Sequence, residues 1–255
     1  MDKQEFYDQV AIVTGAGQGI GFEICRQLAM NGAAVVLNDI EENLTSSATN
    51  KIKAEGGNCV GITGDASEIS FINEMVKKAV NDFGKLTIAI ANAGITLFAD
   101  FFDYTPDAFN KVMQLNLGGS FFLAQAAARQ MKQQGTGGSI LLMSSVVGHQ
   151  AHKNLAAYAI TKAGVEMLAK NLVIELSPCN INVNAIAPGA TVTERTSEDK
   201  EYTKTWSRIT PLGRPATTNE IANAALFLVS PGAKHITGQS LIIDGGWTSV
   251  SPSPY

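Results

Sequence analysis

The sequence predicts a single α/β domain, residues 1–255, built on a doubly wound parallel sheet of seven strands. Seven short apolar runs alternate with longer segments that have helical spacing. Most of these runs are rich in Val, Ile and Leu, as expected of strands covered on both faces. The chain is long enough for one large core, and it shows no internal repeat, low-complexity linker or change of composition.

The apolar runs predict strands at residues 10–14, 34–38, 58–62, 86–91, 139–143, 181–187 and 240–244. Helical spacing is clearest in residues 20–30, 69–83 and 157–176. We interpret the longest polar insert, residues 190–215, as a substrate lid within the same domain. The tail from Ser249 to Tyr255 has two prolines and three serines, so we expect it to be either disordered or held by a partner subunit.

The composition excludes several classes of protein. The net charge is −4, and the sequence has no long run of Lys or Arg, so neither nucleic acid nor a membrane surface is an expected partner. No segment has ~18 uninterrupted apolar residues, and the polar N-terminus lacks the core of a signal peptide. Three scattered cysteines, Cys25, Cys59 and Cys179, indicate free thiols in a reducing compartment. We therefore expect a cytoplasmic location.

The segment Y158-A-I-T-K162 is the strongest chemical signal. In a helix this spacing puts Tyr158 and Lys162 on one face, where the ammonium lowers the pKa of the phenol and prepares it for proton transfer. Taken alone, the pair also fits a solvated helix face. Ser145, thirteen residues upstream, and a glycine-rich turn near the N-terminus favour the catalytic interpretation.

The glycine-rich turn T14-G-A-G-Q-G-I-G21 joins the first predicted strand to a helix. Gly15 permits the sharp turn, Gly19 lets the backbone approach a pyrophosphate, and Gly21 allows close helix packing. This strand, turn and helix context is what a dinucleotide site requires.

Asp39, at the end of the second predicted strand, favours NAD over NADP. Its carboxylate is placed to accept hydrogen bonds from the adenosine ribose hydroxyls, and it would repel a 2′-phosphate. Gln18 in the glycine turn and Ile40 after the aspartate supply no compensating positive charge. The alternative is that Asp39 caps the following helix, and the two roles are compatible.

With these motifs in order, the chain resembles the short-chain dehydrogenase/reductase family over nearly its whole length. The matching segments are T14-G-A-G-Q-G-I-G21, N92-A-G94, N116-L-G-G119, Ser145, Y158-A-I-T-K162 and P188-G-A-T-V-T193. The resemblance implies a Rossmann-type fold, a nicotinamide cofactor and a catalytic tetrad of Asn116, Ser145, Tyr158 and Lys162.

The resemblance also implies a role for each member of the tetrad. Tyr158 is the general base in alcohol oxidation and the general acid in carbonyl reduction. Lys162 lowers the Tyr158 pKa and hydrogen-bonds the nicotinamide ribose. Ser145 donates a hydrogen bond to the substrate oxygen, and Asn116 holds a water that links Lys162 to solvent. Taken singly, Ser145 also fits a loop cap, and Asn116 fits a polar residue within a helix.

The remaining cofactor contacts follow from the same resemblance. Asp65 matches the position that contacts the adenine ring, although a helix-capping role before Ser67 also fits, and Asn92 fits a purely structural turn as well. The full expected set is Gly15, Gln18, Gly19, Ile20, Asp39, Asp65, Ala66, Asn92, Ala93, Gly94, Tyr158, Lys162, Pro188, Gly189, Thr191 and Thr193.

We expect His149 and His152 to be solvated loop residues, because neither has an adjacent carboxylate or cysteine that would complete a metal site. His235 has no evident role. The lid is mixed and polar, with Tyr202 and Trp206 placed to stack on a ring. This composition favours a sugar, a polyol or another small hydroxylated compound.

The predicted function is NAD-dependent interconversion of a secondary alcohol and a ketone. A 3-oxoacyl thioester or steroid carbonyl reductase is one alternative, and a non-catalytic nucleotide-sensing protein is another. Small and apolar residues in the helical segments 115–131 and 157–176 fit either the core or a two-fold interface. The family commonly pairs these helices, which implies a homodimer or homotetramer.

Overall fold

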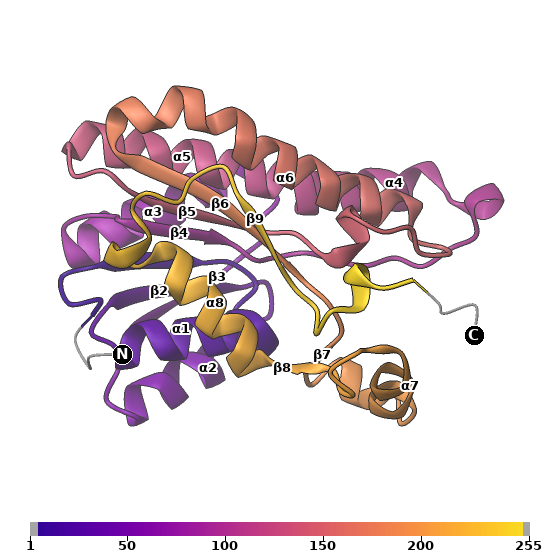
Figure 1. The fold of residues 1–255 in the computed structure, drawn as a ribbon. Coiled ribbons are helices and arrows are strands. Elements are labelled where there is room, and N and C mark those ends of the chain that lie inside the picture. The colour runs from indigo at the N-terminus through magenta and orange to yellow at the C-terminus, as the bar shows by residue number, and fades with distance from the viewer. Residues whose placement is uncertain (1–4, 252–255) are drawn as a thin grey trace.

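The fold is a seven-stranded parallel sheet with helices on both faces, in a computed structural model that describes residues 5–251. The strand order is β3-β2-β1-β4-β5-β6-β9 (Figure 1). The strands are β1 (Val10–Val13), β2 (Ala34–Asp39), β3 (Asn58–Thr63), β4 (Ile88–Ala91), β5 (Gly138–Met143), β6 (Ile181–Pro188) and β9 (Ser240–Ile243). The predicted fold class and all seven predicted strands are confirmed.

Helices cover the sheet in two layers (Figure 1). One face carries α1 (Gly19–Met30), α2 (Glu42–Ala54) and α8 (Thr218–Val229). The other carries α3 (Ile69–Phe83), α5 (Ser120–Gln134) and α6 (Ala156–Leu176), and α4 (Pro106–Val112) continues this layer. The three predicted helices correspond to α1, α3 and α6.

Each face of the sheet has its own apolar core, because successive side chains of a strand point to opposite faces. In β1, Ala11 and Val13 pack towards Ile24 and Leu226, whereas Val10 and Ile12 pack towards Ile72 and Leu123. Because both faces are buried, the sequences of these strands are continuous apolar runs.

Local signals set several helix boundaries. Thr105 accepts a hydrogen bond from Ala108 N–H, and Pro106 occupies the first turn of α4. Thr217 and Glu220 form a reciprocal capping box at the start of α8. Gly84, at φ 82°, ends α3 in the left-handed conformation that glycine adopts without strain.

Two features were not predicted. Between α4 and α5 the chain forms a π-helical segment, η2 (Met113–Gly119). Within and after the expected lid, β7 (Thr191–Val192) pairs in parallel with β8 (Ala216–Thr217), and α7 (Tyr202–Ile209) lies between them. The role of residues 190–215 as a lid stays a prediction.

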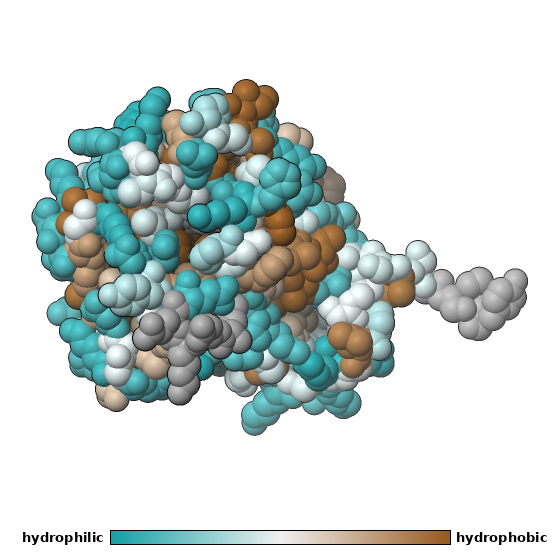
Figure 2. Space-filling view, turned by 60° about the vertical axis from the view of Figure 1, so that its left-hand side comes forward, coloured by the Kyte–Doolittle hydropathy of each residue, from teal (hydrophilic) through white to brown (hydrophobic). Residues whose placement is uncertain are grey.

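The surface and the thiols agree with the composition. Hydrophilic side chains cover most of the face in Figure 2, with separate hydrophobic areas among them. Cys25 and Cys59 are buried, Cys179 is half-buried, and all three are free. Burial raises the pKa of the Cys59 thiol to about 11. None of the helices within residues 5–251 is both long and apolar enough to cross a membrane. Of the predicted tail, residues 252–255 lie outside the described range.

Candidate active site

The predicted site residues gather at the carboxyl ends of the parallel strands, where open α/β sheets bind ligands. The glycine turn follows β1, Asp39 ends β2 and Asp65 follows β3. Asn92 to Gly94 follow β4, Ser145 follows β5, and Gly189 follows β6. The order of strands reverses at β1 and β4, so the turns after these two strands flank the topological switch point.

The glycine turn approaches the turn after β4 too closely for side chains. Gly15 has φ 59°, and a Cβ added there would lie 2.7 Å from the Cα of Ala93. The Asn92 side-chain amide donates to the backbone oxygens of Thr14 and Gly15 at 2.9 and 2.8 Å. The structural role considered for Asn92 is therefore present, since this side chain fastens the two turns together.

A cavity of about 620 Å³ lies beside this turn. Its lining contains eight of the predicted cofactor residues: Gly15, Gln18, Asp39, Asp65, Ala66, Asn92, Ala93 and Gly94. It also contains residues that sequence reasoning missed, among them Asn38, Ile40, Lys111, Gln114 and Leu115. Glycines at the turn leave the backbone open to a ligand, and the carboxylate of Asp39 stands at the rim. These residues fit the adenosine half of a dinucleotide.

Asp39 uses both of its carboxylate oxygens within the protein. Oδ2 accepts a hydrogen bond from Gly17 N–H at 2.9 Å, and Oδ1 accepts one from Glu41 N–H at 3.2 Å. The side chain therefore fixes the glycine turn and the approach to α2, although Glu41, not Asp39, is the N-cap residue. Each carboxylate oxygen has lone pairs left for a ribose hydroxyl.

Asp65 combines a local contact with a place in the cavity wall. Its Oδ1 accepts a hydrogen bond from Ser67 N–H at 2.8 Å. This contact closes a turn and does not cap a helix, because α3 begins at Ile69 and its N-cap residue is Glu68. Ala66 beside it is buried, and its carbonyl lies 2.7 Å from where a Cβ of Gly119 would be. The turn after β3 is thus held close to η2.

Lys162 is buried beside Tyr158, the expected proton-transfer residue. Its side chain is on α6, one turn after Tyr158, and its Nζ lies 5.3 Å from the centre of the Tyr158 ring. The ammonium donates a hydrogen bond to the carbonyl of Met143 at 2.8 Å. Only 3% of the lysine is exposed, so its charge acts on its neighbours with little screening by water.

Asn116 lies in η2 and is fully buried. Its amide group pairs with the backbone of Ile95 in both directions at 2.9 Å and donates to Thr161 Oγ1 at 3.3 Å. A Cβ at Gly94 would lie 3.2 Å from Asn116 Oδ1 and 3.5 Å from Lys162 Nζ. Asn116 and Lys162 thus converge on Gly94. Single π turns within helices frequently occur at functional sites.

Ser145 begins the short helix η3 (Val146–Gly148) directly after β5. Its Oγ accepts a hydrogen bond from Val147 N–H at 3.3 Å, so the loop-cap role considered for it is real. The hydroxyl hydrogen is not used in this contact and remains a free donor.

The segment after β6 meets the glycine turn. A Cβ at Gly189 would lie 2.7 Å from the Cβ of Asp244, which makes this turn another close approach of two chains. Thr191 is buried, and its N–H donates to the Tyr202 hydroxyl at 3.1 Å. Thr193 bonds with Thr196 and lies 3.6 Å from a Cβ placed on Gly19.

Glu194 was not predicted as a site residue. Its Oε2 accepts a hydrogen bond from Gly19 N–H at 3.0 Å, at the helix N-terminus where a pyrophosphate is expected. Its carboxylate stands where an anionic phosphate oxygen of the cofactor is expected. Ile20, predicted as a contact, is in the first turn of α1 and packs its side chain against the core.

Of the two loop histidines expected to be solvated, His149 is exposed, and its Nε2 also pairs with Glu166 Oε1 at 2.9 Å. His152 is half-buried and lies against other aromatic rings. The His152 ring lies 5.2 Å from Trp247 and 6.2 Å from Trp206, and Trp206 in turn contacts Tyr202. These four rings are called the aromatic cluster below. Within the described residues, no group of three or more His, Cys, Asp or Glu side chains is placed to hold a metal ion.

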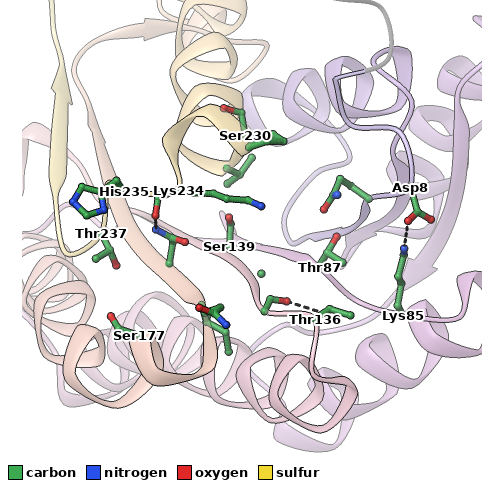
Figure 3. A pocket seen from close by; sticks show the side chains of 18 residues that line it. Asp8, Lys85, Thr87, Thr136, Ser139, Ser177, Ser230, Lys234, His235 and Thr237 are labelled. Carbon is green, nitrogen blue, oxygen red and sulfur yellow. Dashed lines mark hydrogen bonds and ion pairs between the residues drawn. The ribbon is translucent and has the colours of Figure 1, made fainter.

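A larger hollow, of about 910 Å³, lies at the opposite edge of the sheet (Figure 3). It is lined by residues that precede the strands, including the Asp8–Lys85 ion pair and Lys234, which extends over Ser139. Neither cavity has a tetrad residue in its lining. We assign the smaller cavity to the cofactor, because its lining includes the glycine turn and Gly94, and Gly94 adjoins Asn116 and Lys162.

Comparisons with known proteins agree with this geometry. A family model described as enoyl-(acyl carrier protein) reductase matches residues 15–248. The crystal structure of a short-chain type dehydrogenase/reductase from Mycobacterium marinum superposes with a TM-score of 0.92 at 31% identity, over 97% of this chain and 98% of that one. The chain belongs to the short-chain dehydrogenase/reductase family.

Two further relatives are informative about chemistry. L-rhamnose 1-dehydrogenase (NAD(P)(+)) from Azotobacter vinelandii is 36% identical over 246 residues, covering 94% of this chain and 96% of that protein. A gluconate 5-dehydrogenase from Burkholderia cenocepacia, in complex with NADP and tartrate, has a TM-score of 0.90 at 32% identity, over 98% of this chain and 99% of that one. This short-chain dehydrogenase/reductase is thus an oxidoreductase acting on CH–OH groups with a nicotinamide dinucleotide.

Proposed function

We propose that this protein is an NAD-dependent dehydrogenase of a secondary hydroxyl group on a sugar, a polyol or a similar small hydroxylated compound. The observation that carries the proposal is the buried Lys162 amine beside the Tyr158 ring, at the same edge of the sheet as the glycine turn. A protein that only sensed a nucleotide would have no need for this proton-transfer pair.

A bound nicotinamide cofactor would supply the acceptor for the hydride that leaves the carbinol carbon. Tyr158 removes the hydroxyl proton, and the nearby ammonium of Lys162 stabilises the phenolate that this step requires. Ser145 directs its hydroxyl hydrogen at the substrate oxygen as charge develops there. Two hydrogen bonds with the backbone of Ile95 hold Asn116, and with it η2, next to Lys162. In this position Asn116 supports a water path from the Lys162 ammonium to solvent.

The NAD preference rests on Asp39. Its carboxylate is at the rim of the cavity, and the adjacent Ile40 is an exposed apolar residue that cannot hold a 2′-phosphate. Lys111 also lines this cavity and is the residue that would favour a phosphate. We weigh Asp39 more heavily, because it bonds the glycine turn itself and is therefore fixed in place.

The aromatic cluster supports a ring-shaped hydroxylated substrate. It joins the loop between Ser145 and Tyr158, two of the proposed catalytic residues, to α7 and to η7 (Trp247–Ser249). Rings of this kind offer apolar faces while their polar edges find hydrogen bonds. The rhamnose and gluconate relatives act on compounds of the same chemical class.

A homodimer or homotetramer in the cytoplasm completes the proposal. Ile160, Met167 and Ile174 recur every seventh residue on α6 with 54, 57 and 80% of their surfaces exposed. Leu241 and Ile242 of the edge strand β9 are also exposed, as is Phe227 of α8. Exposed apolar stripes and open strand edges favour pairing with another chain. One surface gives a dimer, and both together give a tetramer.

The test is the appearance of NADH absorbance when the purified protein and NAD are mixed with sugars, polyols, hydroxysteroids and 3-hydroxyacyl thioesters, with NADP run in parallel. We expect the strongest signal from one of the sugars or polyols with NAD. A signal confined to steroids or thioesters would contradict the substrate class, and faster turnover with NADP would contradict the cofactor assignment.

A further inference from the structure

Glu166 is a largely buried carboxylate one helical turn beyond Lys162. Its side chain is 12% exposed, and its Oε1 contacts two polar groups of the loop after β5. The Ser144 hydroxyl donates a hydrogen bond to Oε1 at 2.5 Å, and His149 Nε2 lies 2.9 Å from the same atom in an ion-pair contact. Both residues flank the proposed catalytic Ser145 in sequence. One oxygen atom on α6 therefore holds the loop on both sides of that serine.

Ser144 is connected to the same turn of α6 by further contacts. Its hydroxyl also lies 2.9 Å from the carbonyl of Lys162, and its backbone N–H donates to Ile186 of β6 at 2.7 Å. The residue before it, Met143, accepts the hydrogen bond from Lys162 Nζ. The start of the loop after β5 therefore contacts both the backbone carbonyl and the side-chain ammonium of Lys162, the proposed catalytic lysine.

Gly148 shows how closely the loop sits on the helix. A Cβ added there would lie 3.1 Å from Ala163 N, from Lys162 C and from Glu166 Oε1. This approach is tighter than side chains normally permit, so η3 lies directly against the turn of α6 between Lys162 and Glu166. The Glu166 carboxylate lies beside this contact between η3 and α6.

A largely buried carboxylate costs free energy that an apolar residue of similar volume would not. The hydrogen bond from Ser144 and the ion-pair contact with His149 offset part of that cost, and they define a geometry that an apolar contact would not. We propose that Glu166 is a positioning residue that sets Ser145 against Tyr158 and Lys162 through Ser144 and His149. The inference rests on the proposed role of Ser145 in the reaction.

The test separates hydrogen bonding from charge and from bulk. Glu166→Gln keeps an oxygen that accepts from Ser144 and lies beside His149, whereas Glu166→Leu keeps the volume and removes the acceptor. Ser144→Ala removes one donor and leaves the helix intact. Glu175→Leu, an exposed position on the same helix, is the matched control.

We expect Glu166→Leu to lower kcat on the order of tenfold to a hundredfold, because small misplacements of reacting groups have effects of this size. Ser144→Ala should lower kcat in the same direction, while Glu166→Gln and Glu175→Leu stay near wild type. The KM for NAD should be unchanged in all four. The substrate is the compound that gives the strongest signal in the panel described above.

Amide hydrogen exchange gives a readout that needs no substrate. Residues 144–149 should exchange faster in Glu166→Leu and Ser144→Ala, and at the wild-type rate in Glu166→Gln. Unchanged exchange and unchanged kcat in Glu166→Leu would overturn the proposal. An equal loss of kcat in Glu166→Gln and Glu166→Leu would overturn it as well, because charge would then be the cause.

Ser145→Ala, measured in parallel, separates this inference from the function on which it rests. If Ser145→Ala retains full kcat, the proposed role of Ser145 fails. If Ser145→Ala is inactive while Glu166→Leu and Ser144→Ala are normal, only the positioning role fails.

Discussion

Asp39 tests the cofactor assignment at the scale of a single residue. We expect Asp39→Ala to weaken NADH binding by roughly tenfold to a hundredfold, because a charge-assisted hydrogen bond contributes about 1.5–3 kcal/mol. NADPH binding should improve relative to NADH, since the repulsion of its 2′-phosphate is gone. Fluorescence titration of both nucleotides measures the two dissociation constants.

The control for this variant is Asp82→Ala, which removes an exposed carboxylate of α3 that pairs with Lys78. It should leave both dissociation constants unchanged. Tighter binding of NADPH than of NADH by the wild type would show that Asp39 does not select the cofactor.

Residues within one motif were predictable, and partners from distant segments were not. Tyr158 and Lys162, four apart, and Gly15 and Asp39, at fixed places after strands, follow from local spacing. Glu166 has no signal in the sequence, because its contacts with Ser144 and His149 exist only once α6 packs on the loop after β5. The same holds for Glu194, which reaches Gly19 across 175 positions of the chain.

At the scale of elements, the contact between the lid segment and α1 predicts a competition. Glu194 Oε2 accepts the hydrogen bond from Gly19 N–H. The cofactor pyrophosphate is expected to need the same donor. We expect Glu194→Gln to bind NADH several-fold more tightly, because removing a carboxylate near a helix N-terminus relieves repulsion of the incoming phosphates. Titration at low and high salt measures the effect, which should shrink at high salt.

Glu198→Gln, one turn further along the lid segment and exposed, is the matched control and should bind NADH as the wild type does. Weaker NADH binding by Glu194→Gln would contradict the competition and would assign Glu194 a supporting role in binding.

The capping box of α8 predicts a pH-dependent contribution to stability. The hydrogen bond from Arg214, followed by the backbone N–H of Thr217, lowers the pKa of Glu220 from 4.5 to about 2. A lowered pKa stabilises the folded state above pH 4.5, and that stabilisation is lost as the pH falls towards 2.

Glu220→Gln keeps the cap but loses the charge, so its Tm should be lower by roughly 1–2 °C at pH 7, as expected of an exposed ion pair. Thermal unfolding of both proteins from pH 7 to pH 3 should show the difference shrinking below about pH 4.5. A difference that grows on acidification would contradict the assignment.

Element prediction succeeded where burial imposes a pattern. The seven strands of the main sheet are apolar because helices cover both faces, and α3 matches its predicted range from Ile69 to Phe83. β7 and β8 have two residues each, too few for any period. The π turn at Asn116 arises from how η2 packs against Ile95, which no local propensity encodes.

At the scale of the whole molecule, the apolar stripe on α6 predicts association between copies of this chain. Met167→Glu places a charge in the middle of that stripe and should lower the molecular mass measured by light scattering to that of a smaller assembly. Asn73→Glu, an exposed position on α3 with the same change of charge, should leave the mass unchanged. A wild-type monomer at micromolar concentration would contradict the proposed oligomer.

The central claim is that the chain transfers a proton through Tyr158 as part of alcohol oxidation. The most direct measurement compares Tyr158→Phe with wild type for both turnover and NADH binding, with the exposed Tyr7→Phe as control. We predict that Tyr158→Phe loses about 10²–10⁴-fold in kcat, the usual contribution of general acid–base catalysis, while its NADH dissociation constant stays within about twofold. Wild-type turnover in Tyr158→Phe would contradict the claim.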